Sequence, residues 1–199
     1  IVFINDEDDN WKDGVYYGDA SGGENTKYPA LRRIGVGLAC FNDQFKFGLH
    51  SNLPGCIQTV GRGELFSLVL LVRYLHRHTV CEFVTDNHNV YNTFNKGPVS
   101  AMNSADCDLY QDFLTHIQLK QIHITVRWMP SHLSEGKKIR PPGVSDLDIE
   151  ANDKADELAA SAAALCQVPL PVAKNHKYYV RLIKRIQERL TNILLHLPK

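Results

Sequence analysis

Four acidic residues stand where the sequence predicts the ends of strands or the starts of helices. Asp19 ends a short β-rich run, and Asp86 ends a nearly continuous apolar strand. Glu64 lies in the first turn of a predicted helix, and Asp156 lies early in another. Strand ends and helix starts can meet at one edge of a sheet, where clustered carboxylates repel each other unless a cation joins them. Oxygen ligands without Cys or His select Mg²⁺ or Mn²⁺.

Such a cluster has a specific chemical use. Two divalent ions about 3.5–4 Å apart can clamp an in-line phosphoryl displacement, one ion activating a water and the other stabilising the leaving oxygen. Each acid also has a simpler interpretation. Asp at a strand end is often a turn residue, Glu64 complements the helix dipole, and Asp156 fits an exposed helix position. For each acid taken alone, the simpler interpretation is the commoner case.

The elements that would position these acids follow from hydrophobic patterning. Strands are predicted at 15–19, 33–41, 45–53, 80–86 and 122–129, and helices at 61–77, 108–119 and 151–166. Three strands, a helix, a strand, helices, a strand and a helix indicate a mixed α/β sandwich. Residues 133–150 are polar and rich in proline, and we expect a long loop there.

Composition limits the class of protein. The 199 residues carry 22 basic and 22 acidic side chains, and 44% of them are apolar, which is typical of a globular chain. Residues 1–10 hold four acids and no base, residues 167–199 hold seven bases and one acid, and residues 11–166 hold 15 bases and 17 acids. A nucleic-acid partner usually leaves a basic footprint. Metal ions on four of the acids would leave residues 11–166 slightly basic.

The cysteines and the apolar runs indicate the compartment. The five cysteines are odd in number, widely spaced and without a C-x-x-C pair, so we expect no zinc site. Cys40 and Cys81 lie in apolar strand-like runs and are predicted to be buried thiols. No apolar run approaches the roughly 20 residues that span a bilayer, and no secretory signal is visible. We expect an intracellular protein, in the nucleus or cytoplasm, with no membrane partner.

Five short motifs follow one another in a fixed order. They are DASGG starting at Asp19, GRGEL containing Glu64, VTDN containing Asp86, PSH ending at His132, and N-x-x-x-D-E-L-A starting at Asn152. Together they resemble the motifs of type 1 ribonuclease H, including the domains attached to reverse transcriptases. The resemblance covers residues 13–166 and implies an α/β RNase H-like fold, with a five-stranded mixed sheet and helices on both faces.

The resemblance implies roles for these residues. The metal ligands for two Mg²⁺ or Mn²⁺ ions would be Asp19, Glu64, Asp86 and Asp156. His132 would be the mobile histidine that assists water activation or product release.

The final motif also assigns its neighbours. Asp156, rather than Asp153, occupies the acidic position because it stands four residues after Asn152. Asn152 itself would hold the loop or the network beside the metals. The remaining acids, Asp146, Asp148, Glu150 and Asp153, are expected to solvate the loop or cap the helix.

The family cleaves the RNA strand of an RNA/DNA hybrid, which requires a reader of the 2′-hydroxyl. Many members carry T-N-Q-R-A-E where this chain has TVGRGE at 59–64. Thr59 keeps the position that contacts a DNA phosphate. Val60 and Gly61 replace two amide side chains that touch the RNA, although Gly61 still offers a backbone N–H. Asn25 is either a further RNA contact or an ordinary loop asparagine. Trp128 is expected to be a core strand residue.

The chain is expected to have three parts: an acidic extension at 1–12, the catalytic domain at 13–166, and a basic linker and amphipathic helix at 167–199. Apolar residues recur at three- and four-residue spacing from 179 to 197, with bases on the other face. This helix, over about 175–197, is expected to dock on the domain or on an upstream neighbour such as a reverse-transcriptase domain. The alternative is a contact with nucleic acid or a partner protein.

The leading hypothesis is a metal-dependent endonuclease that hydrolyses the RNA strand of RNA/DNA hybrids by a two-metal-ion mechanism. Because the chain begins at Ile1 rather than Met, we expect it to be part of a retroelement or another larger polypeptide. One alternative is an RNase H-like scaffold or interaction domain with weak or no nuclease activity. Another is a nuclease or integrase of similar geometry that acts on a different nucleic acid.

Overall fold

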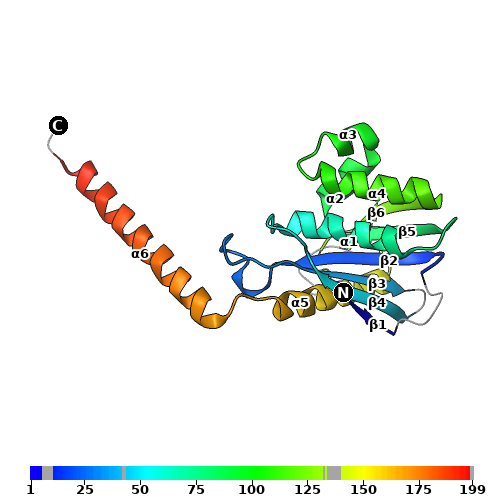
Figure 1. The fold of residues 1–199 in the computed structure, drawn as a ribbon, viewed down its shortest axis with the longest axis horizontal. Helices are drawn as coiled ribbons and strands as arrows, with labels where there is room; N and C mark the ends of the chain where they lie inside the picture. Colours follow the sequence, from blue (N-terminus) through cyan, green and yellow to red (C-terminus); the bar gives the residue numbers. More distant parts are fainter. Residues whose placement is uncertain (6–10, 42–43, 132, 134–139, 198–199) are drawn as a thin grey trace.

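The computed structural model describes residues 1–5, 11–41, 44–131, 133 and 140–197. A six-stranded sheet lies at its centre, with helices on both faces and a long C-terminal helix leading away from it (Figure 1). The strands are β1 (Val2–Ile4), β2 (Gly14–Ser21), β3 (Gly35–Phe41), β4 (Phe45–Asn52), β5 (Val80–Thr85) and β6 (His123–Trp128). They are ordered β1-β4-β3-β2-β5-β6 across the sheet.

The sheet is mixed, as predicted. Strands β2, β5 and β6 are parallel, whereas β1, β4, β3 and β2 pair in antiparallel fashion. Five of the strands agree with the predicted ones to within a few residues. The sixth, β1, pairs with β4 and was not predicted, because three residues are too few to display an alternating pattern. The first residues of the chain therefore contribute an edge strand to the sheet.

Helices cover the two faces of the sheet unequally. One face carries α1 (Val60–Tyr74), α2 (His88–Asn95), α3 (Pro98–Met102) and α4 (Cys107–Lys120), and the larger apolar core lies beneath them. The other face carries α5 (Asp146–Leu165), which packs on a smaller core over β2, β3 and β4. A short 3-10 helix, η1 (Gly23–Asn25), follows β2, and α6 (Leu170–Leu195) is the last helix of the described chain.

A glycine on β3 sets the distance between α5 and the sheet. Gly37 is the antiparallel partner of Asp19, and a Cβ atom at Gly37 would lie 2.1 Å from the carbonyl oxygen of Ala155. The helix can approach this closely only because β3 has no side chain there. The contact holds α5 across the end of β2 that carries Asp19.

The beginning of α5 differs from the prediction. Residues 133–150 were expected to be a loop, but the helix begins at Asp146. Ser145 is its N-cap: the Ser145 hydroxyl accepts from the Asp148 backbone N–H at 3.0 Å, and Asp148 Oδ2 accepts from Ser145 N at 2.7 Å. This reciprocal capping box satisfies two backbone donors that would otherwise lack partners. Residues 134–139 of the expected loop lie outside the described residues.

Two further expectations concern the cysteines and the absence of membrane-spanning segments. Cys40 and Cys81 are buried free thiols, as predicted. Among the described residues, no helix has both the length and the apolar character needed to cross a bilayer.

Candidate metal centre

Three of the four predicted carboxylates meet at one edge of the sheet. Asp19 lies near the end of β2, and Asp86 directly follows β5. Because β2 and β5 are parallel with Tyr17 opposite Val84, Asp19 and Asp86 both lie two residues beyond that pair and are level with each other. Glu64 reaches them from α1. Carboxylate oxygens of these three residues all lie within 4.8 Å of one another.

The position of Glu64 depends on how α1 begins. Thr59 is the N-cap, and its hydroxyl accepts from the Arg62 backbone N–H at 3.3 Å. Glu64 was predicted to lie in the first turn of this helix. Because the helix begins at Val60, Glu64 lies in its second turn instead. The Arg62 side chain then fixes this end of α1 to the start of α4, through Asp106 Oδ1 at 2.8 Å and a two-pronged pair with Asp108.

Burial makes this cluster electrostatically costly. Asp19 is 8% exposed and Glu64 is 4% exposed. Burial, followed by the negative charge of Asp86, raises the pKa of Asp19 to about 7. Burial and the charges of Asp19 and Asp86 also raise the pKa of Glu64 well above its ordinary value. Asp19 and Glu64 therefore tend to retain protons near neutral pH unless a cation offsets the charge of the cluster.

The cluster has the properties of a divalent cation site. Glu64 Oε2 is buried and has no hydrogen-bond partner among the described residues. A buried acceptor without a donor is rare in folded proteins. Three closely spaced carboxylates and a buried oxygen without a donor fit a hard cation such as Mg²⁺ or Mn²⁺.

Asp156 lies beside this cluster rather than within it. It is exposed on α5, and its negative charge is near enough to raise the pKa of Asp19. Asn152 stands one helical turn earlier and is buried, and its Oδ1 has no hydrogen-bond partner in the described part of the chain. Asp153 is exposed on the same helix. His132 lies outside the described residues, so its predicted role is carried by the sequence alone.

The predicted substrate contacts separate into two groups. Thr59 and Gly61 are exposed at the start of α1, and the Gly61 N–H belongs to the first turn, where amides have no partner within the helix. Asn25 is instead buried, and its Nδ2 donates to Gln167 Oε1 at 3.1 Å. It lines a cavity of about 500 Å³ between η1 and the start of α6.

Trp128 was predicted to be a core residue, and this prediction is wrong. The side chain is 37% exposed at the end of β6, and its indole N–H donates to the Asp86 carbonyl oxygen at 3.0 Å. The His88 ring meets it edge to face, with centroids 5.2 Å apart. An exposed aromatic pair thus lies next to Asp86.

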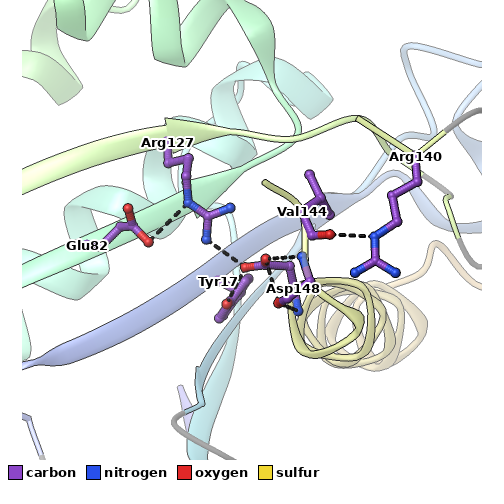
Figure 2. A network of polar contacts seen from close by, with 7 residues as sticks. Tyr17, Glu82, Arg127, Arg140, Val144 and Asp148 are labelled. Carbon is purple, nitrogen blue, oxygen red and sulfur yellow. Dashed lines mark hydrogen bonds and ion pairs between the residues drawn. The ribbon is translucent and has the colours of Figure 1, made fainter. Parts of the chain in front are cut away.

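A polar network fixes the start of α5, the helix that carries Asn152 and Asp156 (Figure 2). Asp148 accepts hydrogen bonds from Tyr17 Oη on β2, Arg127 Nη2 on β6 and the N-cap Ser145. Burial opposes ionisation of Asp148, but the donors from Arg127 and Ser145 outweigh it and lower the pKa of Asp148 to about 2. Asp148 was expected either to solvate the loop or to cap the helix, and the capping box with Ser145 shows that it caps α5.

No protein-family model matches the chain, and no curated protein matches it either. Solved structures do match. The solution structure of the PFV RNase H domain has a TM-score of 0.53 and 16% identity, and the match covers 77% of this chain and 95% of that one. The foamy viral protease-reverse transcriptase in complex with an RNA/DNA hybrid has a TM-score of 0.53 and 14% identity over 76% of this chain.

A native structure of the prototype foamy virus protease-reverse transcriptase also matches, with a TM-score of 0.51 and 16% identity over 76% of this chain. The matched part is about a fifth of each protease-reverse transcriptase chain, 20% and 21%. At these identities the similarity concerns the fold. It agrees with the fold predicted from the five motifs.

Proposed function

Because the chain has a ribonuclease H-like fold, we propose that it is a metal-dependent endonuclease that hydrolyses the RNA strand of RNA/DNA hybrids. The observation that carries this proposal is the meeting of Asp19, Glu64 and Asp86, with oxygens within 4.8 Å of one another. Three clustered carboxylates repel each other and would destabilise a metal-free scaffold, and the raised pKa values of Asp19 and Glu64 reflect this repulsion together with burial.

The metal ligands would be Asp19, Glu64 and Asp86, with Asp156 as the fourth carboxylate at the rim of the site. Bound Mg²⁺ or Mn²⁺, in the family two ions, supplies Lewis acidity that activates water and stabilises charge on the phosphate. The side chains of Asp19 and Glu64 give up their protons when the site is filled. Asn152, buried one turn before Asp156, would hold the loop or the network beside the metals.

The start of α1 would bind the substrate. The Thr59 hydroxyl accepts from Arg62 N and keeps a proton that it can donate to a DNA phosphate. The Gly61 N–H, in the first turn of α1, can donate to the RNA strand. The aromatic pair of His88 and Trp128 offers a stacking surface next to Asp86.

The primary test is cleavage of a labelled RNA strand in an RNA/DNA hybrid with Mg²⁺. We expect products with a 5′-phosphate and a 3′-hydroxyl from the wild-type chain and none from Asp86→Asn. The matched control is Asp13→Asn, because Asp13 Oδ1 accepts from Val80 N at the opposite end of β5 and an amide oxygen can replace it. Equal cleavage by the wild type and Asp86→Asn refutes the proposal. Parallel assays on duplex DNA and duplex RNA test the choice of substrate.

The alternative function is an RNase H-like scaffold with weak or no nuclease activity. The observation that favours it is the exposed Gly61, which has no side chain where family members touch the RNA. A Mg²⁺ or Mn²⁺ titration separates the two functions. A nuclease with the proposed site gains melting temperature as the metal binds, whereas a scaffold shows no metal-dependent rise.

The similarity to protease-reverse transcriptase chains supports a further part of the proposal. We propose that this chain belongs to a retroelement polypeptide and works beside a reverse-transcriptase domain.

A further inference from the structure

Helix α6 leaves the domain almost as soon as it begins. It runs from Leu170 to Leu195, 26 residues, or about 39 Å of helix. Ala173 is the only buried residue that it contributes in the described structure. At its base, the His176 ring meets Tyr28 edge to face and the Lys177 ammonium lies over the same ring, 5.3 Å from its centroid. Beyond this point the helix projects away from the sheet (Figure 1).

The domain therefore contacts only the first two turns of α6, and docking of the helix on an upstream neighbour stays a prediction. The remaining turns carry large apolar side chains that face solvent in the single chain. Contiguous exposed apolar surface of this kind marks a contact with another molecule.

The exposed apolar residues follow a heptad repeat. Five of them lie within α6 and are spaced by four, three, four and three residues, and each is between 50% and 55% exposed: Tyr179, Ile183, Ile186, Leu190 and Ile193. This alternation of three and four places Ile183 and Leu190 at position a and Tyr179, Ile186 and Ile193 at position d. We call these five residues the α6 seam. A seam of a and d residues is the signature of a helix that packs against parallel helices.

The charged residues of α6 lie away from the seam. Lys177 and Lys184 occupy position b, Arg185 occupies c, and Lys174, Arg181 and Glu188 occupy f. The positions that flank the seam are mostly uncharged: Val180, Gln187 and Leu194 at e, and Leu182 at g. Arg189 is the one arginine or lysine at a flanking position between residues 179 and 197. A second copy of the same basic helix can therefore approach without placing rows of like charges opposite each other.

Arg189 also distinguishes the two helix directions. In a parallel pair, position g faces position e of the next heptad, so Arg189 meets Leu194 of the other helix. In an antiparallel pair with the seams in full overlap, g faces g near the centre and Arg189 meets its own copy. The like-charge contact disfavours the antiparallel arrangement.

We propose that α6 is an oligomerisation helix, and that copies of this chain assemble through a parallel coiled coil along the α6 seam. Leu at a with Ile at d, as at Leu190 and Ile193, favours three or four helices over two. The additional apolar residues Leu182 and Leu194 widen the seam and fit the same number. The partner is thus other copies of this chain, and the inference does not depend on nuclease activity.

The experiment is sedimentation or light scattering of the chain of residues 1–199 at micromolar concentration. We expect three to four times the 22.5 kDa of one chain. Leu190→Asp places a charge within the seam and should yield the monomer. The matched control is Leu195→Asp, because Leu195 is at position f and 74% exposed, so the oligomer should persist. Circular dichroism and the melting temperature of the sheet domain verify that both variants are folded.

Three results would overturn the proposal. The first is a wild-type chain that remains monomeric when it is assayed at 100 micromolar. The second is an unchanged mass for Leu190→Asp. The third is a monomeric chain that cosediments with anionic lipid vesicles through the seam, since basic amphipathic helices also bind membrane surfaces.

Discussion

Arg127 Nη2 lies 2.6 Å from Asp148 Oδ1, and this ion pair ties β6 to the first turn of α5 (Figure 2). The Asp148 side chain is 7% exposed, whereas that of Arg127 is about one-third exposed and also contacts Glu82 Oε2 at 3.1 Å. The pair spans the face of the sheet that α5 covers. It holds the start of the helix that presents Asn152 and Asp156 to the carboxylate cluster.

We expect Arg127→Met to destabilise the chain by about 2 kcal/mol, because a buried carboxylate loses a charged donor. The bonds to Asp148 from Tyr17 and Ser145 remain and limit the loss. The measurement is urea unfolding at pH 7.

Arg140→Met is the matched control for that substitution. Arg140 Nη1 pairs with Asp146 Oδ1 at 2.6 Å, but the Asp146 side chain is 96% exposed, and pairs in solvent contribute little. Equal unfolding free energies for the two variants would show that the Arg127 pair does not hold α5.

The carboxylate cluster predicts an unusual pH dependence of stability in EDTA. Asp19 has a pKa raised to about 7 in the folded chain against about 3.9 when unfolded, so between these values the folded state binds more protons. The free energy of unfolding then falls as pH rises from about 4 to about 7. The raised pKa of Glu64 acts in the same direction.

The variant Asp19→Asn isolates this effect, because its amide does not titrate. We expect its unfolding free energy to vary less over the same range, as measured by denaturant titrations at several pH values. If the unfolding free energy of the wild type changed with pH in the same way as that of Asp19→Asn, the raised pKa of Asp19 would not be the cause.

The ionisation of Asp148 affects the pH dependence of stability in the opposite direction to that of Asp19. Its pKa is lowered to about 2 in the folded chain, so its contribution to stability is present above about pH 4 and is lost as pH falls toward 2. Asp148→Asn should therefore remove part of the loss of stability in acid, measured between pH 4 and pH 2.

Much of the metal centre follows from local sequence, for a physical reason. Parallel neighbouring strands end at one edge of the sheet, so Asp19 and Asp86 meet once β2 and β5 are recognised. Helical periodicity then brings Glu64 to the same edge. The residues that fix α5 have no such local pattern. Arg127 is 21 residues from Asp148, and Tyr17 is 131 residues away, so their contacts arise only in the folded chain.

Other features were missed because competing patterns concealed them. The N-cap Ser145 stands in a polar run that follows two prolines, and its partner Asp148 is shorter than the Glu or Gln of the usual capping box. Trp128 continues an apolar strand pattern, so that only its contact with the Asp86 carbonyl distinguishes it from a core residue.

Asp153 and Asp156, two of the acids on α5, can be compared directly for a catalytic role. Asp156 is near enough to affect the pKa of Asp19 and occupies the acidic position of the final motif, whereas Asp153 lies nearly one turn earlier. We expect Asp156→Asn to lower the rate of hybrid cleavage by roughly 100-fold, the scale for losing one electrostatic contact with a transition state. Asp153→Asn should retain most of the activity. Reversed effects in a cleavage assay with Mg²⁺ would move the fourth ligand to Asp153.

Replacing the two glycines at the start of α1 by alanine is expected to have opposite effects on stability. A Cβ atom at Gly61 meets only Asn87 Nδ2, at 3.8 Å, so Gly61→Ala should stabilise the chain by about 0.5–1 kcal/mol through the helix backbone. A Cβ atom at Gly63 would lie 2.5 Å from Ile34 Cγ2 and 2.7 Å from Ala20 Cβ. Gly63→Ala should therefore destabilise the chain by about 1–3 kcal/mol, because it overpacks the contact between α1 and the sheet. Thermal and urea unfolding of both variants would measure the difference, and changes of the same sign would contradict this packing of α1. Gly61→Gln extends the comparison to function: it restores the amide side chain that family members carry at this RNA-contacting position, and we expect it to raise cleavage of the hybrid relative to duplex RNA.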